Sequence, residues 1–193
     1  MSSEGRSTDR RVRRTRNVLH RALIELVLER GYDRVTVRDI LTRADVGRST
    51  FYTHYRDKDD LLLLSSTDYL RAAMTAAAAD TPATEPLAPM RVLFGLAADN
   101  PEVYRALIGR KSGTLLLRTT KAMVAEILAE RMRDRLDMPE AEFATTITFL
   151  SWGVIGLLGA IAEPDLPLSA EEAYERFARL VGPGLASRVR PDD

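Results

Sequence analysis

Cysteine is absent from this chain of 193 residues, and histidine and tryptophan are scarce, with two residues and one. Without cysteine there are no disulfides, thiolate nucleophiles or thiolate metal ligands, a composition that fits a reducing cytoplasm. Neither His20 nor His54 has acidic residues at the spacing of metal ligands, so we expect no metal site, no cofactor and no enzymatic activity. No basic segment followed by an apolar run opens the sequence, and we expect a cytoplasmic protein without an export signal.

An excess of charge of one sign is also missing, because 28 basic residues balance 28 acidic ones. A net charge of zero argues at first sight against a nucleic-acid partner. Residues 1–60, however, hold 14 Lys and Arg against 10 Asp and Glu, and residues 61–193 hold 14 against 18, so the charges are +4 and −4. A basic head joined to an acidic body suits a DNA-binding protein whose body stays off the DNA.

Alternating strand patterns are not visible, and helical spacing predicts an all-α fold of about nine helices. A polar segment, residues 1–9, is predicted to be disordered. An arginine-rich first helix follows from Arg10 and ends at Gly31. Its apolar stripe, at helical spacing, is predicted to be Leu19, Ala22, Leu23, Leu26 and Val27. The later helices are predicted at residues 36–44, 47–55, 61–79, 90–98, 101–108, 114–136, 140–162 and 170–180. We expect a head of residues 10–60 and a regulatory body of residues 61–193, with a proline-rich linker at 81–89.

Residues 36–58 have the pattern of a helix-turn-helix. Thr36 is predicted to cap the first helix, whose apolar side chains recur at helical spacing up to Ala44. Asp45 is predicted to adopt the left-handed turn conformation, and Val46 to fill the angle between the helices. The second helix is predicted to bury two aromatic side chains, Phe51 and Tyr55.

Five polar residues of the second helix are predicted to face outward: Arg48, Ser49, Tyr52, Thr53 and His54. A helix of this diameter fits the major groove of DNA, where arginine pairs with guanine and hydroxyls reach bases or phosphates. The alternative interpretation is a helical hairpin whose polar face is only solvated. For the arginines that open the first helix, contact with phosphate and simple solvation are both open.

Residues 17–63 resemble the N-terminal DNA-binding domain of the TetR/AcrR family of transcriptional regulators. The resemblance rests on a long spaced pattern: Gly31, Tyr32, Thr36, Val37, Ile40, Val46, Thr50, Tyr52, Tyr55, Lys58 and Leu61. Two positions depart from it. Gly47 replaces a frequent serine, which removes one possible hydroxyl contact to DNA, and Asp45 replaces a frequent glycine, which is a tolerable change in the turn.

Carried over position by position, the resemblance implies DNA contacts from Thr36, Arg38, Arg48, Ser49, Thr50, Tyr52, His54 and Lys58. For Thr50 and Tyr52, the alternative to DNA contact is a role in packing. For Lys58, the alternative is a solvated position at the start of a helix. The resemblance also implies a homodimer, in which the last two long helices of each subunit form the interface. A twofold dimer presents two recognition helices to a pseudo-palindromic operator.

The body is expected to hold an apolar small-molecule effector. Methionines and flat aromatic side chains suit such a ligand, and six are candidates to line its pocket: Met90, Phe94, Tyr104, Met123, Phe143 and Trp152. For any one of them, an ordinary place in the core is the stronger alternative.

Residues 144–162 contain no charge and approach the length of a membrane span. Three threonines, one serine and three glycines weaken that interpretation, and we favour a helix buried in an oligomer, with no membrane partner. Its predicted dimer contacts are Leu150, Gly153, Gly156, Leu157, Gly159 and Ala160, with Trp152 adding area.

The sequence therefore favours a DNA-binding transcriptional regulator, a ligand-responsive repressor that binds its operator as a homodimer and is released by an effector. Two alternatives are kept. One is a helical protein-interaction module, and the other is a transcriptional activator of the same fold without a small-molecule inducer. The steep salt dependence expected of DNA binding separates the regulator from the interaction module.

Overall fold

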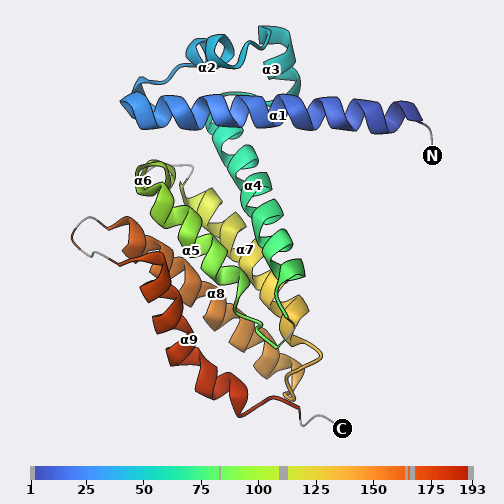
Figure 1. The fold of residues 1–193 in the computed structure, drawn as a ribbon, viewed down its shortest axis with the longest axis vertical. Helices are drawn as coiled ribbons and strands as arrows, with labels where there is room; N and C mark the ends of the chain where they lie inside the picture. Colours follow the sequence, from blue (N-terminus) through green and yellow to red (C-terminus); the bar gives the residue numbers. More distant parts are fainter. Residues whose placement is uncertain (1–2, 83, 109–112, 164, 166–167, 191–193) are drawn as a thin grey trace.

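The fold was analysed in a computed structural model that describes residues 3–82, 84–108, 113–163, 165 and 168–190 (Figure 1). Within these residues the chain is all-α, as predicted, with one short 3₁₀ helix and no strand. The helices are α1 (Ser3–Arg30), η1 (Tyr32–Arg34), α2 (Val37–Ala44), α3 (Arg48–His54), α4 (Lys58–Asp80), α5 (Pro89–Asp99), α6 (Pro101–Ile108), α7 (Gly113–Met132), α8 (Glu140–Ala162) and α9 (Ala170–Ala186).

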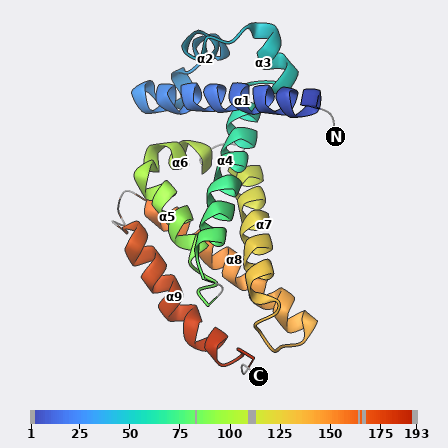
Figure 2. The same cartoon turned by 45° about the vertical axis from the view of Figure 1, so that its right-hand side comes forward.

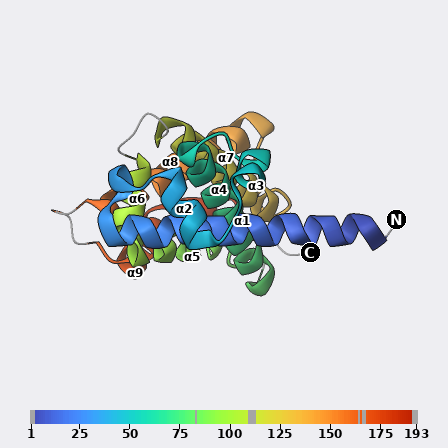
Figure 3. The same ribbon diagram turned by 90° about the horizontal axis from the view of Figure 1, so that it is seen from above.

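The head consists of α1, α2 and α3, with α2 and α3 on the side of α1 that faces away from the body (Figures 1 and 2). The predicted apolar stripe of α1 is buried in the core of the head, and Leu19 and Leu23 are fully inaccessible to solvent. Seen from above, the N-terminal part of α1 extends beyond the rest of the molecule (Figure 3). The helix begins at Ser3 and so includes residues 3–9 of the segment expected to be disordered, whereas residues 1–2 lie outside the described residues.

Helix α4 leaves the head and runs along the body (Figure 1). Asp57 caps it by accepting a hydrogen bond from the Asp60 amide at 2.8 Å. At its other end, the Arg131 guanidinium of α7 donates to the carbonyls of Ala78 at 2.6 Å and Pro82 at 2.8 Å. One half-buried arginine therefore satisfies carbonyls left free by the end of α4, and it fixes the turn in which the prolines interrupt the helix.

In the body, α8 packs against α5, α6, α7 and α9, and α4 packs against α5 and α7. By length and composition α8 is able to cross a membrane, but nine of its residues are buried within this chain, most of them in the apolar core formed with α5, α7 and α9. Three boundaries of these helices differ from the prediction by three residues or more: α4 begins at Lys58, α9 continues to Ala186 and α7 ends at Met132. Leu136 instead forms an isolated antiparallel bridge with Val189, which ties the segment after α9 to the α7–α8 connection.

The head and the body share apolar packing. Val103 of α6 and Leu116 of α7 are buried in the same cluster as Leu19, Phe51 and Leu61 of the head region. Helix α6 contacts α1 directly, so the described residues connect the halves by more than α4 alone.

Candidate DNA-binding surface

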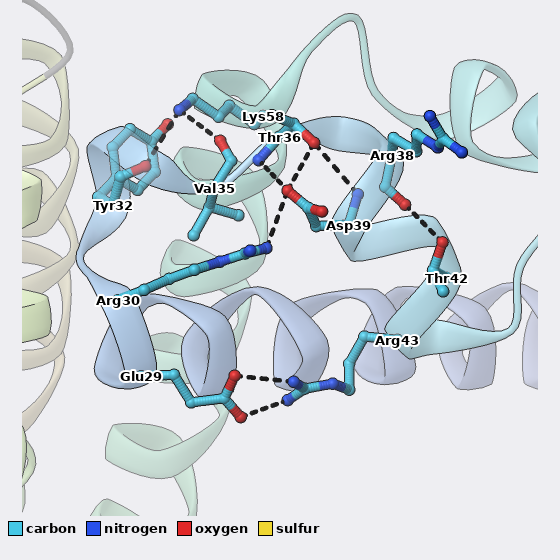
Figure 4. Close-up of polar contacts among 10 residues, drawn as sticks. All are labelled: Glu29, Arg30, Tyr32, Val35, Thr36, Arg38, Asp39, Thr42, Arg43 and Lys58. Carbon is cyan, nitrogen blue, oxygen red and sulfur yellow. Dashed lines mark hydrogen bonds and ion pairs between the residues drawn. The ribbon is translucent and has the colours of Figure 1, made fainter.

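Helix α2 begins with a reciprocal cap (Figure 4). The Thr36 hydroxyl accepts from the Asp39 amide at 3.2 Å, and the Asp39 carboxylate accepts from the Thr36 amide at 2.9 Å and from the Thr36 hydroxyl at 2.6 Å. These hydrogen bonds from Thr36, the hydroxyl first, lower the pKa of Asp39 to about 2. The predicted cap at Thr36 is confirmed, and its only hydroxyl proton is already used within the helix start.

The turn between α2 and α3 has the predicted geometry. Asp45 adopts φ 50° and ψ 49°, and among the described residues it is the one non-glycine with positive φ. The Val46 amide then donates to the Leu41 carbonyl at 3.1 Å, which closes the end of α2. Aspartate tolerates the left-handed conformation better than most side chains, so the departure from glycine at this position preserves the turn.

Ion pairs hold α2 against α1 (Figure 4). The Arg43 guanidinium donates two parallel hydrogen bonds to Glu29, both at 2.8 Å, and lies 3.3 Å from Glu25. Arg30 pairs with Asp39 at 2.8 Å. Each pair is solvent-accessible and worth little alone, but the paired bonds of Arg43 fix the direction of α2 across α1.

Helix α3 presents one buried and one exposed face. Phe51 and Tyr55 are buried, as predicted, and Phe51 anchors α3 in the head core. Arg48, Ser49, Thr50, Tyr52 and Thr53 are exposed, and His54 is half-buried. Tyr52 is 48% exposed and lies edge-on to Phe51.

Two arginines lie on the outer surface of α2 and α3 without an acidic partner. Arg38 and Arg48 are exposed, and neither forms an ion pair with a described residue. The Arg48 guanidinium lies 5.5 Å from the centre of the Tyr52 ring, which limits the directions in which both side chains point. The surface therefore combines unpaired positive charge, hydroxyls and an aromatic ring on a narrow helix.

Lys58 has a partner that the sequence did not predict. Its ammonium donates to the carbonyls of Val35 at 2.8 Å and Tyr32 at 3.1 Å, and lies 4.4 Å from the centre of the Tyr32 ring (Figure 4). Two of its three N–H groups are thus directed to the end of η1, inside the head. Because η1 itself was not predicted, no sequence signal pointed to these carbonyls. These contacts favour a structural role for Lys58 over the predicted contact with phosphate, for which one N–H group remains.

Of the six predicted ligand contacts, Met90, Phe94, Met123 and Phe143 are buried in the apolar core of the body, and none lines a described cavity. Trp152 is 55% exposed, with the Lys121 ammonium 4.8 Å from the centre of its indole ring. Tyr104 alone among the six lines a described cavity, of about 280 Å³, at the junction of head and body. Trp152 lines neither described cavity and lies on the outward face of α8, so its predicted contact with a ligand stays a prediction.

The predicted dimer residues fall into two groups. Leu150 is fully buried, and a Cβ on Gly153 would lie 3.2 Å from the Phe177 ring of α9, so both contact the subunit's own core. Gly156 and Gly159 are open to solvent, and Leu157 and Ala160 are half-buried. The prediction included Trp152 as additional area but missed other large side chains exposed on these helices: Phe149 of α8 and Leu180 of α9. The sequence held a signal for Phe149, because no charged residue lies near it in α8 and an uncharged exposed surface is typical of an interface.

Comparison with known proteins places this geometry in a family. Residues 19–64 match the family described as "Bacterial regulatory proteins, tetR family". The regulator TcmR of Streptomyces glaucescens is 32% identical over 145 residues, which are 66% of this chain and 59% of TcmR. A shorter match over 55 residues, 42% identical, covers 28% of this chain and 14% of the regulator YxbF of Bacillus subtilis (strain 168). The chain thus spans less than two thirds of the length of either curated relative.

Solved structures share the whole fold. The dihydroxyacetone kinase operon activator DhaS superposes with a TM-score of 0.68 at 14% identity, over 91% of this chain and 98% of DhaS. Thermus thermophilus FadR, a transcriptional repressor in complex with lauroyl-CoA, superposes with a TM-score of 0.62 at 21% identity, over 92% and 98% of the two chains. At these identities the superpositions show a shared fold alone. The names of TcmR and YxbF as transcriptional regulators agree with the expectation of a regulator.

Proposed function

This chain belongs to the tetR family of bacterial regulatory proteins, and we propose that it is a cytoplasmic, homodimeric and ligand-responsive repressor that binds a pseudo-palindromic DNA operator. The observation that carries the proposal is the outer face of α3, where Arg48, Ser49, Thr50 and Tyr52 are exposed on a helix anchored by Phe51. A helix held rigidly in this way is suited to direct readout in the major groove.

The contacts are proposed to divide by role. Arg48 and Tyr52 are positioned to reach base edges, with Ser49, Thr50, Thr53 and His54 around them. Arg38 and the N-terminal amides of α2, beside Thr36, are positioned for phosphates, since unpaired positive charge and free amides both attract anions. Lys58 is proposed to position the head through η1 and not to contact DNA.

Dimerisation through α8 and α9 is supported by the exposed apolar side chains on these helices. Phe149 is 67% exposed and Leu180 80% exposed, and Trp152 lies one helical turn from Phe149. Exposed large apolar side chains on two helices that contact each other are typical of an interface. The smooth surface at Gly156 and Gly159 allows close approach of a partner helix. A twofold dimer built this way carries two copies of α3, which doubles the number of DNA contacts.

Release by an effector is supported by the cavity between head and body and by FadR, whose structure holds lauroyl-CoA. A ligand in that cavity acts on the operator only if it binds the DNA-free arrangement better than the DNA-bound one. An activator of the same fold is the second candidate, favoured by the structural similarity to DhaS. The two candidates share the operator-binding step and differ in the effect on transcription.

Selection of bound sequences from a random DNA pool, followed by titration of the enriched site, tests the proposal. We expect an inverted repeat bound by two subunits, with affinity that falls steeply as salt rises. Tyr52→Ala is expected to abolish operator binding while the free energy of unfolding stays unchanged, because its side chain is half exposed. Failure to enrich any sequence at low salt would favour the protein-interaction alternative.

A further inference from the structure

The cavity at the junction of head and body, of about 280 Å³, is lined by residues of six helices. Its volume is close to the lower end of the range of roughly 300–1,000 Å³ typical of small-molecule sites. The head contributes His20, Arg21, Ile24 and Glu25 of α1. From the body come apolar side chains, among them Leu93, Leu96, Val103 and Leu158, with a few polar groups between them. The wall is thus mostly apolar and crosses the boundary between the two halves.

His20 supplies a hydrogen-bond acceptor to this cavity. Ser65 has one hydroxyl proton and donates it to the Leu61 carbonyl at 2.6 Å, so its oxygen accepts at the 2.7 Å contact with His20 Nδ1. We therefore assign the imidazole proton to Nδ1. Burial lowers the pKa of His20, which keeps the ring neutral near pH 7 and leaves Nε2 with a free lone pair.

Tyr104 supplies a donor. Its hydroxyl is buried and has no hydrogen-bond partner among the residues that the structure describes. Burial raises the pKa of Tyr104 well above its ordinary value, so the hydroxyl stays protonated. A buried hydroxyl without a partner is unfavourable, and a ligand acceptor would remove that cost.

Formal charge around the cavity is balanced. Its charged lining residues, Arg21 and Glu25, are both exposed and lie one turn apart on α1, and Glu25 is already paired with Arg43. Among the lining residues no buried charge is available to neutralise a carboxylate or an ammonium, and burying an unpaired charge is costly. The lining therefore selects uncharged molecules.

We propose that this cavity binds an uncharged, mostly apolar small molecule that bears a hydroxyl or a paired donor and acceptor, with His20 accepting and Tyr104 donating a hydrogen bond. The regulatory role of that molecule rests on the proposed function, as its effector. His20 belongs to the head, bonds Ser65 of α4 and stacks on Tyr69 of α4, with ring centres 5.6 Å apart. A ligand held by His20 thus contacts the head itself as well as the helices of the body.

Equilibrium dialysis with 2-naphthol tests the assignment, because its single hydroxyl can donate to His20 and accept from Tyr104. Naphthalene is the matched probe without a hydroxyl. We expect one molecule of 2-naphthol per chain, and Tyr104→Phe and His20→Phe should each weaken its binding about three- to tenfold. Naphthalene binding should change less than about twofold in both variants, since the apolar wall is kept.

Two controls separate the site from general apolar binding. Tyr174→Phe removes the same hydroxyl from a tyrosine that lines a different cavity, and it should leave both probes unaffected. Ala97→Phe fills the junction cavity and should abolish binding of both, with the helical circular dichroism unchanged. No binding of 2-naphthol to the unmodified protein, or equal binding by Tyr104→Phe, would overturn the proposal. Since DNA selection uses the ligand-free protein, its failure would refute the regulator function and leave the result with these probes standing.

Discussion

Lys58 offers a test that separates a structural role from a DNA contact. Its ammonium donates to two carbonyls at the end of η1 and lies over the Tyr32 ring. Hydrogen bonds from a charged donor contribute about 1.5–3 kcal/mol each when buried, and a cation–π contact about 0.5–1 kcal/mol. Lys58 is only half-buried, so these values are discounted. We expect Lys58→Met, which keeps the apolar stem, to lower the free energy of unfolding by about 2–3 kcal/mol.

Urea unfolding at fixed protein concentration measures the change in the free energy of unfolding. Operator titration over a range of salt concentrations measures whether a contact with DNA phosphate is lost. A lost phosphate contact reduces the log–log salt slope by about 0.9. For Lys58→Met we expect weaker operator binding with the slope unchanged, because η1 and the start of α2 lose their support. The matched control is Arg38→Met, which removes an exposed, unpaired charge and should give a shallower slope with unchanged stability. A shallower slope and full stability for Lys58→Met would refute this reasoning.

Three further predictions concern other parts of the molecule. The carboxyl of Asp39 should titrate near pH 2 by NMR, and Thr36→Val should raise that midpoint toward about 3.9. Because the pKa of Asp39 is lowered in the folded state, its contribution to the free energy of unfolding is present above the ordinary pKa and is lost as the pH falls toward 2. Phe149→Asp should convert the proposed dimer to a monomer in light scattering, and a persistent dimer would exclude this face of α8 from the interface. Arg131→Met should lower the free energy of unfolding by about 2–3 kcal/mol in urea, and Arg118→Met, at an exposed position on the same helix, by less than about 0.5 kcal/mol.

Local signals predicted the helix-turn-helix well, because its geometry depends on neighbouring residues. Thr36 and Asp39 form a cap within one turn, and Asp45 takes the left-handed conformation that its short side chain permits. The apolar spacing of α1 and α3 correctly predicted which side chains, such as Leu19 and Phe51, fill the head core. Each of these features is determined by residues close in sequence, so one chain is sufficient to predict them.

Features that depend on residues distant in sequence were not predictable in this way. Helix α8 is apolar on nearly every face, so periodicity did not show that Leu150 points inward and Trp152 outward. A cavity is space that side chains fail to fill, and that depends on how six helices meet, which is why Met90 and Phe94 proved to be core. The role of Lys58 required η1, a single turn of three residues without a periodic signal.

The shared packing of Val103 and Leu116 has a consequence for protein engineering. Burial of each of these side chains against the head contributes about 1.5–3 kcal/mol, which a fragment ending within α4 would lack. A chimera that joins this head to the body of another regulator would meet foreign side chains at both positions. The packing between the head and the new body would then contain either cavities or steric clashes. Transplanting the DNA specificity of this protein therefore requires that α6 and the beginning of α7 be moved together with the head, or that the recipient be redesigned to match them.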